Sequence, residues 1–308
     1  MKKIICALAA LNLIILSLAS CSFGGKKTAL TISGTDIDSE IYAYYLDRVE
    51  QRPEDYGLNS EYKQSEARDA AVDLCVRYLA FNTYFAENGL SLSVSEKVSV
   101  SDNVNNFWMR SGNHFEKIGV SKQTLTKILT SEAYENAIFS YLYDKGTGDM
   151  EAEESIKVYF YGNYVAFRNI CAYYTTDDGS GRITEQERLA LVDTFNAIAA
   201  ASGTDSDSFT TACSDAGYAA SDIAVLEKSN EGYPAGFFDN VNGMQFNEVK
   251  VFEYSDSIFA VRKESLVELG EGLYSSYRDT CIKNMHADEW SAFVEDYIST
   301  FTVDAKNV

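Results

Sequence analysis

Residues 164–174 read YVAFRNICAYY, and at this stretch the chain changes character. Before it, apolar residues recur at helical spacing. Within it, valine, isoleucine and aromatic residues run together, as they do in a buried strand. The polar loop 177–181 (DDGSG) then ends the run. A strand of this kind between helical regions predicts an α+β protein.

The chain before this strand is mainly helical. Residues 28–34 alternate like a strand that enters a turn at Gly34, and Asp38 stands where it can cap the next helix. Asn88-Gly89 supplies a helix stop, and Ser121 follows a break at Gly119. We therefore expect helices after Asp38 and over residues 65–87, 96–109, 122–143 and 151–161.

The chain after the strand alternates between helix and strand before it becomes helical again. The capping box Thr184–Glu187 starts a helix that ends near Gly203, and a short helix follows over residues 208–213. Residues 250–262 have the pattern of a buried strand. Helices are expected from Leu266, and a last short strand is expected over residues 300–303.

These patterns divide the chain into an interrupted helical domain and an insert. The expected helical domain comprises residues 28–163 and 264–308, so it is built from both chain ends. The expected insert comprises residues 164–263. A signal peptide over residues 1–20 and a tether over residues 21–27 come first.

The N-terminus has the features of an export signal. Lys2 and Lys3 precede an apolar run from Ile4 to Leu18, which is too short for a comfortable transmembrane helix. The tetrad LASC at residues 18–21 resembles the lipobox of bacterial lipoproteins. The resemblance implies that Cys21 is diacylated and anchors the mature protein outside the cytoplasm. The alternative is an ordinary secretory signal that happens to adjoin a cysteine.

Composition limits the remaining chemistry. The 308 residues carry a formal net charge of −20, which excludes nucleic-acid partners and leaves the lipid as the means of membrane attachment. Two histidines and no Cys-x-x-Cys pair leave metal sites without support, and no cofactor is expected. Four cysteines lie beyond the tether: Cys75, Cys171, Cys213 and Cys281. The sequence does not decide whether they form disulfides or remain free thiols.

The order of helices, α+β insert and helices on a lipoprotein resembles the extracytoplasmic foldases of the PrsA and SurA type. Residues 30–46 look like that family's opening strand, glycine turn and aromatic helix. In the family, a helical chaperone domain made from both chain ends carries an inserted parvulin-like peptidyl-prolyl isomerase domain. The resemblance implies a SurA-N-like helical domain and a parvulin-like insert here.

The insert departs from the parvulin pattern at its site. On the family register Phe237 lines the proline pocket, but Asn169 stands at the first histidine position. The second histidine position falls at Ser257 or Ile258, and the pocket methionine position falls near Pro234. A prolyl isomerase holds and twists a tertiary amide across a barrier of roughly 20 kcal/mol. Without both imidazoles, isomerase activity is expected to be weak or lost.

The sequence therefore predicts a membrane-anchored extracytoplasmic chaperone that binds unfolded or newly exported polypeptides. Two alternatives stay open. One is an active peptidyl-prolyl cis-trans isomerase. The other is a surface interaction or solute-binding lipoprotein without a chaperone role.

Overall fold

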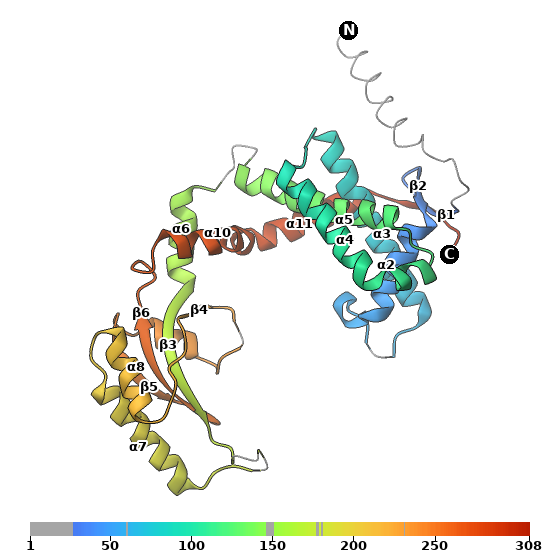
Figure 1. The fold of residues 1–308 in the computed structure, drawn as a ribbon. Coiled ribbons are helices and arrows are strands. Elements are labelled where there is room, and N and C mark those ends of the chain that lie inside the picture. Colours follow the sequence, from blue (N-terminus) through green and yellow to red (C-terminus); the bar gives the residue numbers. More distant parts are fainter. Residues whose placement is uncertain (1–26, 60, 146–150, 177–178, 180, 231) are drawn as a thin grey trace. The chain divides into compact units, whose positions relative to one another are not determined.

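A computed structural model describes residues 27–308 except 60, 146–150, 177–178, 180 and 231 (Figure 1). The expected signal peptide and Cys21 lie outside the described residues. The chain forms two compact units, one from the residues up to Met150 together with Ala287–Val308, the other from Glu151–His286. Each unit combines helices with a small antiparallel sheet, which confirms the α+β class. No helix among the described residues combines the length and the apolar character needed to cross a bilayer.

The first unit is a helical assembly with a three-stranded sheet ordered β2-β1-β7. Its elements are β1 (Thr28–Ile32), β2 (Thr35–Asp38), α2 (Ser39–Gln51), a 3₁₀ turn η1 (Pro53–Tyr56), α3 (Gln64–Glu87), α4 (Val94–Lys117), α5 (Lys122–Ser140), a π turn η2 (Tyr141–Lys145), α11 (Ala287–Ser299) and β7 (Val303–Lys306).

The sheet of the first unit joins the two ends of the chain. Ser33 and Gly34 both have positive φ, at 46° and 77°, as a tight hairpin between β1 and β2 requires. β7 pairs antiparallel with β1. The expected last strand at residues 300–303 was therefore placed too early. The Thr302 carbonyl instead accepts a hydrogen bond from the Ser33 amide at 2.8 Å, beside the hairpin turn.

A single carboxylate ties α2 to the start of α5. Glu40 Oε2 accepts hydrogen bonds from the Ser121 amide at 2.9 Å, from Ser121 Oγ at 2.6 Å and from Thr124 Oγ1 at 2.6 Å. Ser121 is the N-cap of α5, so the negative charge lies at the positive end of that helix.

The second unit is built around a four-stranded antiparallel sheet ordered β4-β3-β6-β5. Its elements are α6 (Glu153–Asn163), β3 (Tyr164–Tyr173), α7 (Glu185–Ala201), α8 (Ser206–Asp215), β4 (Ala224–Glu227), α9 (Phe237–Asn242), β5 (Val249–Glu253), β6 (Ser257–Glu264) and α10 (Glu271–Met285). The strand expected over residues 250–262 is in fact the β5–β6 hairpin. In its turn, the Tyr254 amide donates a hydrogen bond to the Ser257 carbonyl.

α6 and α10 belong to the second unit, so the division of the chain lies outside the positions 163/164 and 263/264 that the sequence suggested. The two helices pack on each other through aromatic rings, with Phe160 5.7 Å from Tyr274 and 5.8 Å from Tyr277 between centroids. Glu153 on α6 accepts hydrogen bonds from Tyr274 Oη and from Arg278 Nε on α10.

The two faces of this sheet carry different cores, because side chains alternate along a strand. One face, which includes Ile170 and Ile258, packs against α7 and α8 through Phe195 and Phe209. The other face holds Val165, Phe167, Phe259 and Val261 and packs against α9. We call the second cluster, which is centred on Phe237, the aromatic cluster.

Candidate functional site

Phe237 lies at the centre of the aromatic cluster with 1% of its surface exposed. Its ring is 4.5 Å from that of Tyr233 in a stacked arrangement, 5.2 Å from Phe167 and 5.1 Å from Phe259. The sequence placed Phe237 on the floor of a proline pocket. In the structure the ring of Tyr233 lies directly on it, so the position is filled by the chain itself.

Asn169 is part of a structural tie. Its amide donates to Ser221 Oγ at 3.0 Å, and Ser221 Oγ donates to Asn169 Oδ1 at 3.2 Å. The Ser221 amide in turn donates to the Asn169 carbonyl at 2.9 Å. These three bonds hold the segment that leads into β4 against β3. The side-chain oxygen of Asn169 therefore already accepts a hydrogen bond within the unit.

The two candidates for the second histidine position lie on opposite faces of the sheet. Ile258 is fully buried in the core beneath α7 and α8. By alternation Ser257 shares the face of Phe259, but it pairs with Tyr173, whereas Asn169 pairs with Val261. Four residues of strand, about 13 Å, separate Ser257 from the residue opposite Asn169. The structure thus does not bring Asn169 together with Ser257 or Ile258.

Pro234 belongs to the turn that precedes α9, and its carbonyl accepts a hydrogen bond from the Phe237 amide at 2.9 Å. The methionine of the aromatic cluster is instead Met244, which is 4% exposed and follows α9. Met244 does not stand out in the sequence. The one available signal was its place three residues after Val241, the last apolar residue of a short helix. Burial raises the pKa of the Tyr233 hydroxyl in this cluster.

The four cysteines of the described chain are free thiols. Burial raises the pKa of Cys171 and of Cys213 to about 11 each, and that of Cys75 to about 12. These thiols are therefore protonated and poorly nucleophilic near neutral pH. Over the described part of the chain, no group of three or more histidine, cysteine or acidic side chains is placed to hold a metal ion.

An open groove lies on the first unit between α4 and α5. It has a volume of about 530 Å³, and the last turns of α3 and the loop before α4 complete it. Its apolar lining comprises Phe85, Leu92, Val100, Val104 and Tyr134. Apart from Tyr134, these side chains are 9% exposed or less. The floor therefore belongs to the core of the unit, which makes it rigid.

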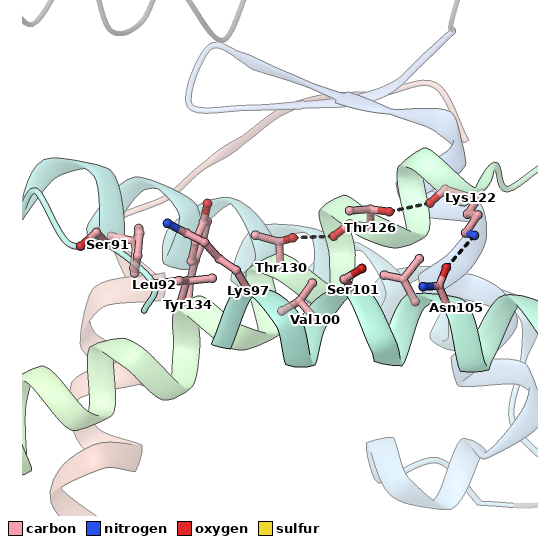
Figure 2. Close-up of a pocket in the computed structure, with 12 residues that line it drawn as sticks. Ser91, Leu92, Lys97, Val100, Ser101, Asn105, Lys122, Thr126, Thr130 and Tyr134 are labelled. Carbon is pink, nitrogen blue, oxygen red and sulfur yellow. Dashed lines mark hydrogen bonds between the residues drawn. The ribbon is translucent and has the colours of Figure 1, made fainter. Parts of the chain in front are cut away.

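The walls of the groove carry polar side chains that point along it (Figure 2). Thr126 Oγ1 donates to the Lys122 carbonyl at 2.9 Å, and Thr130 Oγ1 donates to the Thr126 carbonyl at 2.7 Å. These hydroxyl protons are satisfied within α5, so the wall needs no hydrogen-bond acceptor from a ligand. Lys122 Nζ donates to Asn105 Oδ1 at 2.8 Å across the groove.

The sequence did not reveal this groove. Val100 and Val104 lie four residues apart, and Ser101 and Asn105 follow each of them by one residue. On a helix this spacing places an apolar row beside a polar row. The pattern signals an amphipathic helix, but it does not show that a groove lies between this helix and α5.

Comparisons with known proteins find a distant likeness only. No family model matches the chain, and no curated protein matches it. Among solved structures, foldase protein PrsA from Streptococcus pneumoniae matches with a TM-score of 0.39 at 11% identity, over 89% of this chain and 92% of that one. PrsA from Lactococcus lactis matches with a TM-score of 0.37 at 12% identity, over 90% and 95%. PrsA from Bacillus subtilis matches with a TM-score of 0.25 at 12% identity, over 90% and 92%. The chain is thus distantly similar in structure to PrsA foldases over most of its length.

Proposed function

We propose that this protein is a lipid-anchored extracytoplasmic chaperone that binds unfolded segments of exported proteins in the α4–α5 groove. The observation that carries the proposal is the groove itself, with its buried apolar floor and its open polar walls. An unfolded chain exposes apolar side chains in extended segments. Such side chains can occupy an apolar trough while the backbone stays in contact with polar walls and water.

The dimensions of the groove suit binding without lasting capture. A cavity of about 530 Å³ lies within the range of ligand pockets, roughly 300–1,000 Å³, and accommodates a few side chains and not a folded domain. Burial of two or three apolar side chains supplies about 1.5–3 kcal/mol each, before the cost of ordering the bound segment. Weak, reversible binding of this kind is what a chaperone needs in order to release its client.

The second unit is proposed to contribute little or no isomerase activity. A proline ring needs an apolar surface that is accessible from solvent, whereas Phe237 is covered by Tyr233. Groups that hold a twisted amide have to converge on one point, whereas Asn169 and Ser257 lie far apart on the sheet and Asn169 is bonded to Ser221.

Blocking the groove tests the proposal. Ser101 is an exposed residue of α4 that lines the groove, so Ser101→Trp should fill it without disturbing the core. Ser99 is exposed on the opposite side of the same helix, and Ser99→Trp is the matched control. The chain from Ser22 to Val308 should suppress aggregation of a reduced, unfolded model protein. Ser101→Trp should abolish most of this suppression, whereas Ser99→Trp should retain it. Equal suppression by both variants, or none by the unmutated chain, would refute the proposal.

A further inference from the structure

The groove is a locally basic site on an acidic protein. Acids outnumber bases by 46 to 26 in the chain, yet the residues that line the groove include two lysines and no aspartate or glutamate. Lys97 forms no ion pair with any residue that the structure describes, and Lys122 bonds the neutral amide of Asn105. Both positive charges are thus available to a carboxylate that enters the groove.

The acidic residue next to Lys97 is engaged elsewhere. Glu96 belongs to the capping box of α4, in which its Oε2 accepts a hydrogen bond from the Ser93 amide at 2.6 Å. More distant carboxylates are screened, because the Debye length is about 8 Å at physiological ionic strength. A ligand in the groove therefore experiences the two lysines more strongly than the net charge of the protein.

The two lysines act from positions along α4 whose spacing suits an extended peptide. Lys97 and Asn105 are eight positions apart on α4, so their Cα atoms are about 12 Å apart along the helix axis. The charge of Lys97 is carried on a flexible stem that starts at the first of these positions and extends toward Tyr134 in Figure 2. Because Lys122 Nζ is bonded to Asn105, its charge lies at that second position. An extended strand rises about 3.3 Å per residue, so 12 Å corresponds to roughly four residues.

Residues i, i+2 and i+4 of an extended peptide point to the same side. Carboxylates at i and i+4 would then face Lys97 and Lys122, and the side chain at i+2 would face the apolar row of Val100 and Val104 between them (Figure 2). We propose that the groove selects extended segments in which two acidic residues four positions apart flank an apolar residue midway between them. This selectivity rests on the proposed function, because it specifies the class of client segment bound at the same groove.

Peptide binding measured by fluorescence anisotropy tests the selectivity on the chain from Ser22 to Val308. The probe is a fluorescein-labelled dodecapeptide with glutamates at i and i+4, leucine at i+2 and serine and glycine elsewhere. A second peptide has lysines in place of the glutamates, and a third has the two glutamates adjacent. We expect the first peptide to bind about tenfold more tightly than the second and several-fold more tightly than the third.

Charge reversal in the protein should reverse the preference. In the double variant Lys97→Glu, Lys122→Glu the lysine peptide should bind more tightly than the glutamate peptide. Both positions are exposed and near helix N-termini, where glutamate is well tolerated, so the variant should fold. Lys127→Glu is the control, because Lys127 is exposed on α5 outside the groove, and it should leave the ratio unchanged within about twofold.

The outcomes separate this proposal from the function on which it rests. If Ser101→Trp abolishes aggregation suppression but glutamate and lysine peptides bind equally, the chaperone groove stands and its charge selectivity is wrong. If the double variant keeps the original preference, the lysines do not set it and the proposal is also wrong. A change of oligomeric state in the double variant, measured by sedimentation velocity, would identify a second copy of the chain as the occupant and overturn the proposal.

Discussion

Replacing Phe237 by alanine should destabilise the second unit strongly, because this ring packs at the centre of the aromatic cluster. Phe237 is 1% exposed and contacts the rings of Tyr233, Phe167 and Phe259. Truncation removes these contacts and leaves a cavity beneath α9. Substitutions of this kind cost about 3–5 kcal/mol.

The expected loss can be converted into a change of hydrogen exchange. A decrease of about 4 kcal/mol in the free energy of opening corresponds to roughly a thousandfold faster exchange of the amides that open with the unit. The central strands β3 and β6, which pair over eight positions, should show the full effect. Hydrogen exchange with mass-spectrometric readout on peptides from these strands measures it.

The first unit supplies an internal reference in the same sample. Trp108 and Trp290, the two tryptophans of the chain, lie on α4 and α11 of the first unit. The urea midpoint followed by tryptophan fluorescence should therefore change little in Phe237→Ala, while exchange in β3 and β6 accelerates. A parallel shift of both signals would mean that the two units do not unfold separately.

Phe246→Ala is the matched control, because Phe246 is 60% exposed in the same unit. It should accelerate exchange in β3 and β6 less than about fivefold, since surface substitutions usually fall within 0.5 kcal/mol. The reasoning would be refuted if Phe237→Ala cost less than about 1 kcal/mol. It would equally be refuted if the unmutated chain accelerated proline-limited refolding and a fully folded Phe237→Ala did not.

Three further predictions follow from individual residues. Burial raises the pKa of Cys171 to about 11, so at pH 8 iodoacetamide should alkylate it about a hundredfold more slowly than an ordinary thiol. The alkylation rate, measured by peptide mapping, should rise about tenfold per pH unit up to pH 11. Glu40→Ala removes the acceptor of three hydrogen bonds at the start of α5 and should cost about 2 kcal/mol in urea unfolding followed by tryptophan fluorescence, whereas Glu40→Gln should cost less. Mass spectrometry of the mature N-terminus should find a diacylglyceryl group on Cys21, and an unmodified chain that begins elsewhere would contradict the lipobox resemblance.

Local signals in the sequence predicted the elements that have strong caps. Asp38, Ser121 and the box Thr184–Glu187 each accept a hydrogen bond from the first turn of the helix that they precede. The end of α4 was missed, because residues 110–117 include Gly112, Asn113 and His114, which are weak helix formers. Packing compensates there. A Cβ at Gly112 would lie 3.2 Å from the Trp108 ring, so glycine at this position lets the ring pack against the helix.

The elements missed in the second unit are those that depend on long-range contacts. β4 has four residues and no sequence signal of its own, and it is held by pairing with β3. The β5–β6 hairpin was taken for one strand, because its turn interrupts the apolar pattern over only three residues, 254–256. The face on which each residue lies follows from alternation. The register between β3 and β6 does not, so the separation of Asn169 from Ser257 could not be predicted.

The aromatic cluster and the α4–α5 groove differ in how their apolar residues are packed. In the second unit, aromatic rings from β3, β6, α9 and the segment before α9 cover one another, so no side chain of a client is needed to shield Phe237. In the first unit, Val100 and Val104 form part of the floor of a groove that Thr126 and Thr130 line from α5. The hydroxyls of both threonines are turned back to the carbonyls of α5, and Lys122 is held across the groove by Asn105. The groove therefore stays open although the hydroxyl protons of this wall are satisfied within α5, which is why we propose client binding for the first unit.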